Sequence, residues 1–250
     1  METKSKYAIS IKNARVAYGP NVALTDTSID IAYGTFSGVI GMNGAGKSTI
    51  FKLIMGLVET QSGSVLICGD EPKLAQKHGH VAYVPQTELV DWDFPVSVYE
   101  VVMMGRLGLQ GLLKTPSTTD QKFVEEALQK VSMLDFAKRQ IGELSGGQKK
   151  RVFVARALAQ GADILLLDEP FAGLDSISER ALTTLLVALK EEGKTIILAT
   201  HDLTSLSENC DRVALVKKTV LAYGPTSEVF TKELVSQTFD GLIHNVAFAK

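Results

Sequence analysis

Apolar and polar residues alternate along the first part of the chain. From Ala8 to Val16 the period is close to two, which predicts a half-buried strand. A second strand is expected over Leu24–Ile31, after the turn residues Gly19-Pro20-Asn21. Two such strands joined by a short turn predict an antiparallel β subdomain in this part of the fold.

Other segments are continuously apolar and short, which is typical of strands buried on both faces. They are Phe36–Ile40, Ile164–Leu167, Thr195–Ala199 and Arg212–Val216. Between the second and third of these, Ser176–Glu192 has the length and pattern of a helix. A strand–helix–strand order favours parallel pairing, so we expect a parallel sheet with both faces covered.

The pattern becomes helical from Val96 to about Gln160. One amphipathic helix is expected to include Glu125–Leu134, and a second is expected to begin at Gly146. The sequence therefore predicts one α/β domain over residues 1–250, with a mostly parallel core sheet, an N-terminal antiparallel β subdomain and a helical subdomain over about residues 90–160. The tail over about residues 232–250 is not placed by its pattern: it either packs on the core or helps two copies associate.

Composition narrows the possible functions. The 250 residues are 45% hydrophobic and 22% charged, which is ordinary for a globular protein. A net charge of −2 gives no reason to expect a nucleic-acid partner. Cys68 and Cys210 are interpreted as small apolar residues, and no segment approaches the roughly 18 apolar residues that span a bilayer. The pair His78-Gly79-His80 makes an incomplete metal site, so we expect solvated loop residues there.

A glycine-rich loop lies between the strand that ends at Ile40 and a helical segment that starts near Lys47. Glycines in such a loop let backbone N–H groups approach phosphate oxygens, and the helix N-terminus adds a favourable field. Lys47 is placed to reach the outer phosphates, and the Ser48 hydroxyl to coordinate Mg²⁺. The predicted nucleotide-binding residues are Gly41, Met42, Asn43, Gly44, Ala45, Gly46, Lys47, Ser48 and Thr49.

Two carboxylates end the apolar strand over residues 164–167. The carboxyl ends of strands in a parallel sheet face the ligand crevice, so Asp168 is expected to meet the Mg²⁺ shell. Glu169 projects differently and suits a general base that polarises the attacking water. The alternative, a solvated acidic turn, is weakened by the glycine loop upstream.

The stretch Leu144-Ser145-Gly146-Gly147-Gln148 follows the glycine loop in the same chain. With that loop, it resembles the ATP-binding cassette of ABC transporters, and the resemblance runs from roughly Ile9 to Gly224. The resemblance implies an ATPase that uses ATP and Mg²⁺. It also implies roles for single residues: adenine stacking for Tyr18, sensing of Mg²⁺ and γ-phosphate for Gln86, a subunit-crossing loop for Asp175, and γ-phosphate contact for His201.

The pentapeptide also predicts how two copies assemble. Ser145 can cap a helix, while Gly146 and Gly147 leave backbone N–H groups open to an anion. The glycine loop already forms one phosphate cradle in this chain. The resemblance implies that Leu144, Ser145, Gly146, Gly147 and Gln148 bind the γ-phosphate held by a second copy, in a head-to-tail dimer. The alternative is an ordinary serine cap.

The segment over residues 89–106 resembles cassettes that serve importers of manganese, zinc or iron. Trp92 and Phe94 are expected to line a groove for a permease helix; alternatively, they cover the helical insert as a small apolar cluster.

The resemblance implies an ATPase subunit at the cytoplasmic face of the inner membrane of a bacterium, serving a separate permease and, indirectly, an extracytoplasmic metal-binding protein. Manganese is expected first and zinc or iron next. The alternative functions are a cassette for another cargo, an exporter cassette, a non-transport ABC ATPase, or a catalytically silent binding module. Glu169 and His201 argue against the last of these.

Overall fold

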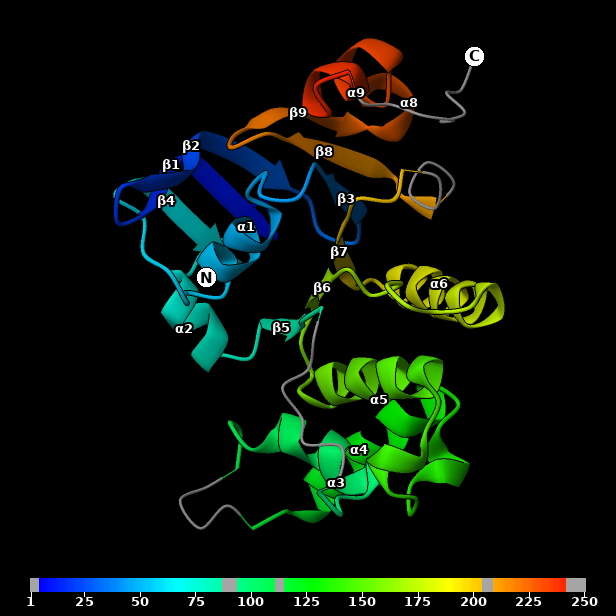
Figure 1. The fold of residues 1–250 in the computed structure, drawn as a ribbon. Helices are drawn as coiled ribbons and strands as arrows, with labels where there is room; N and C mark the ends of the chain where they lie inside the picture. Colours follow the sequence, from blue (N-terminus) through cyan, green and yellow to red (C-terminus); the bar gives the residue numbers. More distant parts are fainter. Residues whose placement is uncertain (1–4, 87–93, 111–114, 204–208, 242–250) are drawn as a thin grey trace.

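Two β-sheets organise the chain in its computed structural model, which describes residues 5–86, 94–110, 115–203 and 209–241 (Figure 1). The smaller sheet has the strand order β2-β1-β4, with antiparallel pairing throughout. Its strands are β1 (Ile9–Tyr18), β2 (Asn21–Ile31) and β4 (Ser62–Ile67). This sheet confirms the predicted antiparallel subdomain and adds β4, whose pairing with β1 is non-local.

The larger sheet has the order β5-β6-β7-β3-β8-β9. All neighbouring pairs are parallel except β8 with β9, which is antiparallel at one edge. The strands are β3 (Phe36–Ile40), β5 (Val81–Val84), β6 (Ile164–Asp168), β7 (Thr195–Thr200), β8 (Arg212–Val216) and β9 (Val220–Pro225). The mostly parallel α/β core that the sequence predicts is confirmed.

Both faces of the parallel strands are buried, which explains their unbroken apolar runs. On β6, Leu165 and Leu167 belong to one core cluster, while Ile164 and Leu166 belong to another. The first cluster also contains the apolar residues of the helical segment, and the second contains those of the small sheet. Each strand therefore needs apolar residues at every position, not at alternate ones.

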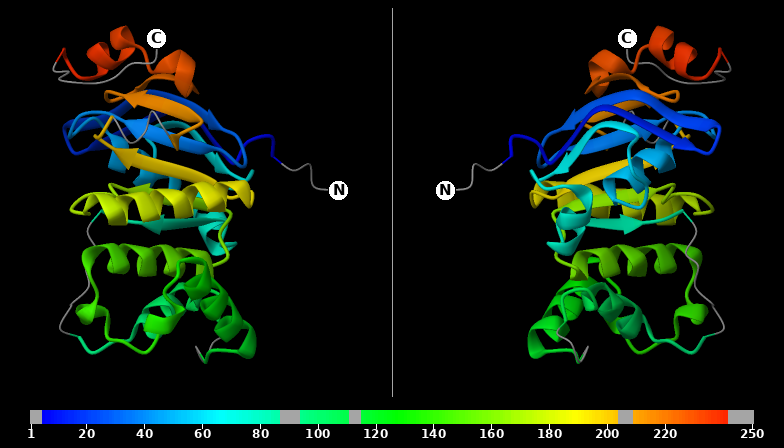
Figure 2. Two further views of the ribbon diagram at one scale, coloured as in Figure 1. Left: turned by 90° about the vertical axis from the view of Figure 1, so that its right-hand side faces the viewer. Right: turned by 90° about the vertical axis from the view of Figure 1, so that its left-hand side faces the viewer.

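Helices cover these sheets. They are α1 (Lys47–Ile54), α2 (Pro72–Lys77), α3 (Val98–Met103), α4 (Thr118–Lys130), α5 (Gly146–Ala159), α6 (Ser176–Glu191), α8 (Thr226–Val229) and α9 (Lys232–Thr238). Helices α3, α4 and α5 pack against one another and form a layer below the sheet, with α6 beside it (Figures 1 and 2). The predicted starts at Gly146 and Ser176 are confirmed.

The part of the tail that the structure describes packs on the core. Helix α9 lies against β8 and β9, at the opposite end of the molecule from the helical layer (Figure 2). Val235 is fully buried, and Phe239 is 9% exposed within the main core cluster. In the described part of the tail, Val235 and Phe239 therefore contribute to the core, and a role of the tail in association of two copies stays a prediction.

Candidate nucleotide site

Residues from distant parts of the chain converge at the carboxyl edge of the parallel sheet. The glycine loop follows β3, Asp168 ends β6 and His201 follows β7. Because β6, β7 and β3 are parallel neighbours, their carboxyl ends meet at one edge. The cleft there is lined by Ala23, Met42, Asn43, Gly44, Gly46, Lys47, Ser48, Thr49, Gln86, Asp168, Glu169 and His201.

Backbone geometry at the loop depends on glycine. Gly46 has φ +107° and precedes α1 as its N-cap. A Cβ at Gly46 would lie 2.6 Å from Cδ2 of Leu24, and one at Gly41 would lie 2.3 Å from the carbonyl oxygen of Val216. No side chain caps the first turn of α1. Its first N–H groups therefore keep the capacity to bind an anion.

Lys47 is buried in the cleft, with only 6% of the residue exposed. Its Nζ donates to the carbonyl oxygens of Gly41 at 2.7 Å and Met42 at 3.2 Å, and lies 4.0 Å from Oε1 of Glu169. Burial lowers the pKa of Lys47, while the carboxylates of Glu169 and Asp168 act in the opposite direction. A buried ammonium that is held by two carbonyls of its own loop is positioned to neutralise phosphate charge.

Asp168 is one of two buried carboxylates in the cleft. The Ser48 side chain hydrogen-bonds to it, and the Tyr83 hydroxyl donates to its Oδ2 at 3.3 Å. Burial raises the pKa of Asp168, and these two hydrogen bonds oppose that rise. The neighbouring oxygen donors Ser48 and Gln86 line the same cleft. Hydroxyl, amide and carboxylate oxygens are the ligands that Mg²⁺ prefers, so this donor set fits the predicted cation.

Glu169 and His201 form a pair at the mouth of the cleft. Glu169 Oε1 lies 2.8 Å from Nδ1 of His201. The glutamate residue is 7% exposed, whereas the histidine side chain is 59% exposed. Glu169 has φ +47°, a conformation that costs a non-glycine residue energy, and its N–H donates to the Ala199 carbonyl at 2.8 Å. This turn directs Glu169 away from the path of β6.

The signature pentapeptide begins α5 but does not line this cleft. Ser145 caps α5: its hydroxyl accepts from Gln148 N–H at 3.3 Å, and Gln148 Oε1 accepts from Ser145 N–H at 2.9 Å. Leu144 is buried in the core, while Ser145 and Gly146 are exposed. A Cβ at Gly147 would lie 2.5 Å from Oγ of Ser178, whereas one at Gly146 would meet nothing within 4 Å.

Asp175 lies close to that region, because it caps the neighbouring helix α6. Its Oδ1 accepts from the N–H groups of Ile177 at 3.0 Å and Ser178 at 2.9 Å, and its Oδ2 accepts from the Ser178 hydroxyl at 2.9 Å. The N–H of Ser178 is the main cause of the lowered pKa of Asp175. Gly147 therefore packs on Ser178, the residue that Asp175 holds. The predicted subunit-crossing loop and the signature lie next to each other.

One contact was missed by the sequence analysis. Lys150 Nζ, from α5, donates to the backbone carbonyl of Gln86 at 2.9 Å. Lys149 and Lys150 directly follow the signature, and their sequence surroundings are equally compatible with solvated side chains. No local signal could have shown this contact, because its two residues are 64 positions apart.

The remaining predicted residues lie outside the cleft or outside the described residues. Tyr18 ends β1 and is 45% exposed; it is not among the residues that line the phosphate cleft. Phe94 is 60% exposed, which argues against its covering the helical core. Trp92 lies outside the described residues. The roles of all three stay predictions.

The glycine loop, the buried Asp168 and the Glu169–His201 pair define a nucleoside-triphosphate site of the P-loop class. The sequence pattern of the ABC transporter family matches residues 24–172, more than half of the chain. The chain therefore belongs to the ABC transporter family, and its fold is that of the ATP-hydrolysing subunit.

Similar proteins support this assignment over nearly the full length. The manganese transport system ATP-binding protein MntA of Synechocystis sp. is 48% identical over 96% of this chain and 93% of its own. The zinc transport system ATP-binding protein TroB of Treponema pallidum is 43% identical over 98% of this chain and 91% of its own. An inward-facing ABC transporter assigned to the metal-chelate type superposes with a TM-score of 0.83 at 27% identity, over 93% of this chain and 89% of its own.

Proposed function

We propose that this chain is the ATP-hydrolysing subunit of a bacterial importer for a divalent metal ion, with manganese as the first candidate. The observation that carries the proposal is the near full-length similarity to a manganese transport ATP-binding protein, combined with an intact set of cleft residues. The zinc protein TroB supports zinc as the alternative. A chelated-iron transport system protein, YfeB of Yersinia pestis, is 47% identical and makes an iron chelate the third candidate. Within the described residues, no helix is both long and apolar enough to cross a membrane.

The cleft residues divide the work of phosphoryl transfer among them. The loop from Gly41 to Thr49 would cradle the phosphates with backbone N–H groups, and Lys47 would exchange its loop carbonyls for phosphate oxygens. Ser48, Gln86 and Asp168 would hold Mg²⁺, which supplies charge neutralisation on the phosphates.

Glu169 is the proposed general base. A carboxylate that is buried, and whose backbone leaves the strand through a left-handed turn, is fixed in position before water arrives. His201 would orient that carboxylate through its 2.8 Å contact and present its exposed ring to the γ-phosphate. This arrangement supports hydrolysis, and it argues against a silent binding module.

A second copy of the chain is the proposed partner for the signature. Ser145 and Gly146 are exposed at the start of α5, and none of the signature residues lines the chain's own phosphate cleft. The N-terminus of α5 is exposed, and no atom lies within 4 Å of a Cβ built at Gly146. Such a helix end suits an anion supplied from outside the chain. Two copies arranged head to tail would place each signature on the other's ATP.

The proposed permease contact uses the exposed Phe94 together with Trp92. An exposed phenylalanine beside the helical layer suits a groove for an apolar helix of the permease. The complex would lie at the cytoplasmic face of the inner membrane. A metal-binding protein outside that membrane would deliver the ion, so the cargo would not bind the ATPase subunit on its way through.

Uptake by cells that lack the chain tests the proposal. Cells should lose uptake of radioactive Mn²⁺, wild-type protein should restore it, and Glu169→Gln should not, although it should still copurify with the permease. Glu179→Gln, an acidic residue on α6 outside the cleft, is the matched control and should restore uptake. Restoration by Glu169→Gln would refute the ATP-driven role, and selective loss of Zn²⁺ or iron uptake would reassign the cargo.

A further inference from the structure

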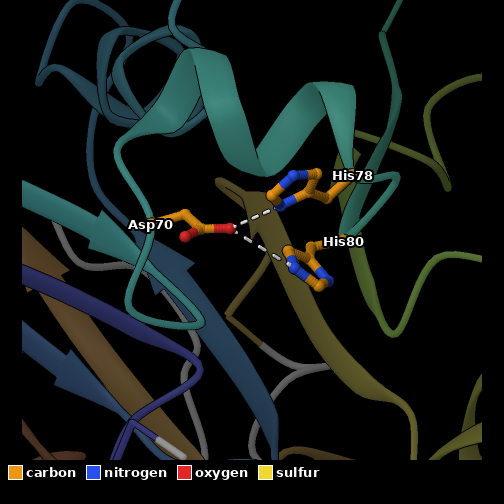
Figure 3. Close-up of side chains that lie close together, drawn as sticks. All are labelled: Asp70, His78 and His80. Atoms are coloured by element: carbon orange, nitrogen blue, oxygen red, sulfur yellow. Dashed lines mark hydrogen bonds and ion pairs between the residues drawn. The ribbon is translucent and has the colours of Figure 1, made fainter. Parts of the chain in front are cut away.

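Three potential metal ligands meet at the ends of α2, away from the nucleotide cleft. Asp70 follows β4, His78 ends α2 as its C-cap, and His80 precedes β5. Figure 3 shows the two imidazole rings directed toward the carboxylate of Asp70. The sequence analysis interprets His78 and His80 as solvated loop residues because two ligands are too few. The structure adds Asp70 as the third.

The distances among the ligand atoms suit one cation. Nδ1 of His78 lies 2.8 Å from Oδ2 of Asp70, and Nε2 of His80 lies 3.6 Å from the same oxygen. One ligand atom from each residue lies within 4.8 Å of the other two. Adjacent ligands at about 2.0–2.2 Å from a metal are separated by about 2.8–3.6 Å in octahedral or tetrahedral geometry. Small side-chain rotations would therefore bring all three onto one ion.

The backbone holds the three residues in place. Asp70 and Ile67 exchange backbone hydrogen bonds in a tight turn after β4. The N–H groups of His78 and His80 donate to carbonyls of α2, at 2.9 and 3.0 Å, and the carbonyl of His80 accepts from Ile164 N–H at 3.0 Å. Gly79, with φ +77°, reverses the chain between the two histidines. The backbone positions of the three ligands are thus fixed before an ion binds, which lowers the entropy cost of binding.

We propose that Asp70, His78 and His80 form a binding site for a divalent first-row transition-metal cation. Two imidazoles and one carboxylate favour such ions over Mg²⁺ or Ca²⁺, which prefer oxygen ligands alone. The side chains are 28%, 49% and 33% exposed, in the order Asp70, His78, His80, so water can complete the coordination. Without a metal ion, Asp70 and His78 hydrogen-bond to each other instead. None of the three residues lines the nucleotide cleft.

A bound ion would join two parts of the fold. It would tie the end of β4, in the antiparallel sheet, to the start of β5, in the parallel sheet, across α2. Strand β5 ends at Val84, two residues before Gln86 of the nucleotide cleft. A bound ion would therefore restrain the segment from β4 to β5, which leads to Gln86. This inference does not depend on the identity of the transported ion.

The test measures Zn²⁺ binding to the purified, tag-free, chelator-treated full chain by titration calorimetry, with Co²⁺ absorption as a second probe. We expect one ion per chain at the cluster, and a roughly ten-fold or greater loss of affinity in His78→Gln, His80→Gln and Asp70→Asn. Glu71→Gln removes a neighbouring carboxylate outside the cluster and should bind like wild type. Zn²⁺ should also slow amide exchange over residues 70–80 in the wild type and in Glu71→Gln, but not in the three cluster variants.

Several outcomes would overturn the proposal. One is equal Zn²⁺ affinity in the wild type and the three cluster variants. Another is the absence of binding at millimolar Zn²⁺. A third is binding that survives all three substitutions but is lost in His201→Ala, which would place the ion in the nucleotide cleft. MgATP binding by each variant, compared with wild type, verifies folding. Metal uptake is not a readout here, so failure leaves the proposed transport function untouched.

Discussion

Lys150 and Gln86 are joined by a 2.9 Å hydrogen bond from the lysine ammonium to the glutamine's backbone carbonyl. Lys150 lies on α5, the helix that the signature pentapeptide begins, and Gln86 lines the nucleotide cleft just after β5. The contact therefore connects the surface proposed for a second copy to a proposed Mg²⁺ ligand. The two residues are 64 positions apart in the sequence, so this link exists only in the folded chain.

Removing this contact should separate nucleotide binding from turnover. In Lys150→Met, Gln86 loses its hydrogen bond to α5. We expect ATPase activity to fall roughly two- to ten-fold, which matches the free energy that an exposed hydrogen bond to a charged group contributes. The affinity of the single chain for MgATP should stay within about two-fold, because Lys47 and the loop are unchanged. Steady-state hydrolysis and fluorescent-nucleotide titration check both values. Lys122→Met, on the exposed face of α4, is the control; an unchanged turnover in Lys150→Met would contradict the prediction.

Loss of the histidine should affect chemistry more than affinity. His201→Ala removes the Nδ1 partner that lies 2.8 Å from Glu169 Oε1. We expect the hydrolysis rate to fall about 100-fold, within the range for a group that assists general base catalysis, while MgATP binding changes little. Single-turnover hydrolysis at saturating ATP separates the two effects. A large loss of ATP affinity with normal turnover would instead assign His201 to binding alone.

Two adjacent glycines should differ in how much an alanine substitution destabilises the fold. Gly147→Ala places a Cβ 2.5 Å from Ser178 Oγ and 2.7 Å from its Cβ, so α5 and α6 must move apart. Overpacking of this kind costs about 1–3 kcal/mol in the free energy of unfolding. Gly146→Ala meets no atom within 4 Å and should leave stability nearly unchanged. Urea unfolding measures both variants.

The same pair tests the proposed dimer. Gly146→Ala adds a methyl group at the exposed helix start, so ATP-dependent association should weaken although the monomer is stable. Association is measured by analytical ultracentrifugation in the Glu169→Gln background. As a control for the packing argument, the double variant Gly147→Ala/Ser178→Gly lacks the Ser178 side chain with which the added methyl group would clash. Its free energy of unfolding should therefore recover part of the loss seen in Gly147→Ala. Normal association of the Gly146→Ala protein would contradict a signature that acts on a second copy.

The ion pair of Asp120 predicts a pH dependence of stability. Hydrogen bonds from Ser117 N–H, the Arg106 side chain and the Ser117 hydroxyl lower the pKa of Asp120 from 3.8 to about 2. A lowered carboxyl pKa stabilises the fold fully above the unfolded value, and this contribution disappears as the pH falls from about 4 toward about 2. The difference in free energy of unfolding between wild type and Asp120→Asn, called here the stability gap, should therefore be largest near neutral pH and should narrow below pH 4.

Denaturant titrations between pH 7 and pH 3 measure that gap. Asp135→Asn, an exposed carboxylate near the end of α4, serves as the control and should show a small gap at every pH. A gap that stays constant between pH 6 and pH 3 would show that Asp120 contributes through packing or helix capping, not through its charge.

Much of this protein follows from local patterns in the sequence. Unbroken apolar runs such as Ile164–Leu167 predict buried parallel strands, because only residues apolar at every position can satisfy two covered faces. The glycine loop and the Asp168-Glu169 pair predict the cleft, since their chemistry is encoded in contiguous residues. The start of α5 is likewise predicted by Ser145 and the glycines that follow it.

Contacts between distant residues could be decided only by the tertiary structure. Strand β4 is exposed at most of its positions and β5 has only four residues, so their own residues give a weak signal. Their hydrogen bonds come from β1 and β6, which lie far away in the sequence or follow a long insert. Lys150 meets Gln86, and Asp70 meets His78 and His80, only because the chain turns back between them. A sequence fixes which groups are available, whereas folding determines which of them come within hydrogen-bonding distance.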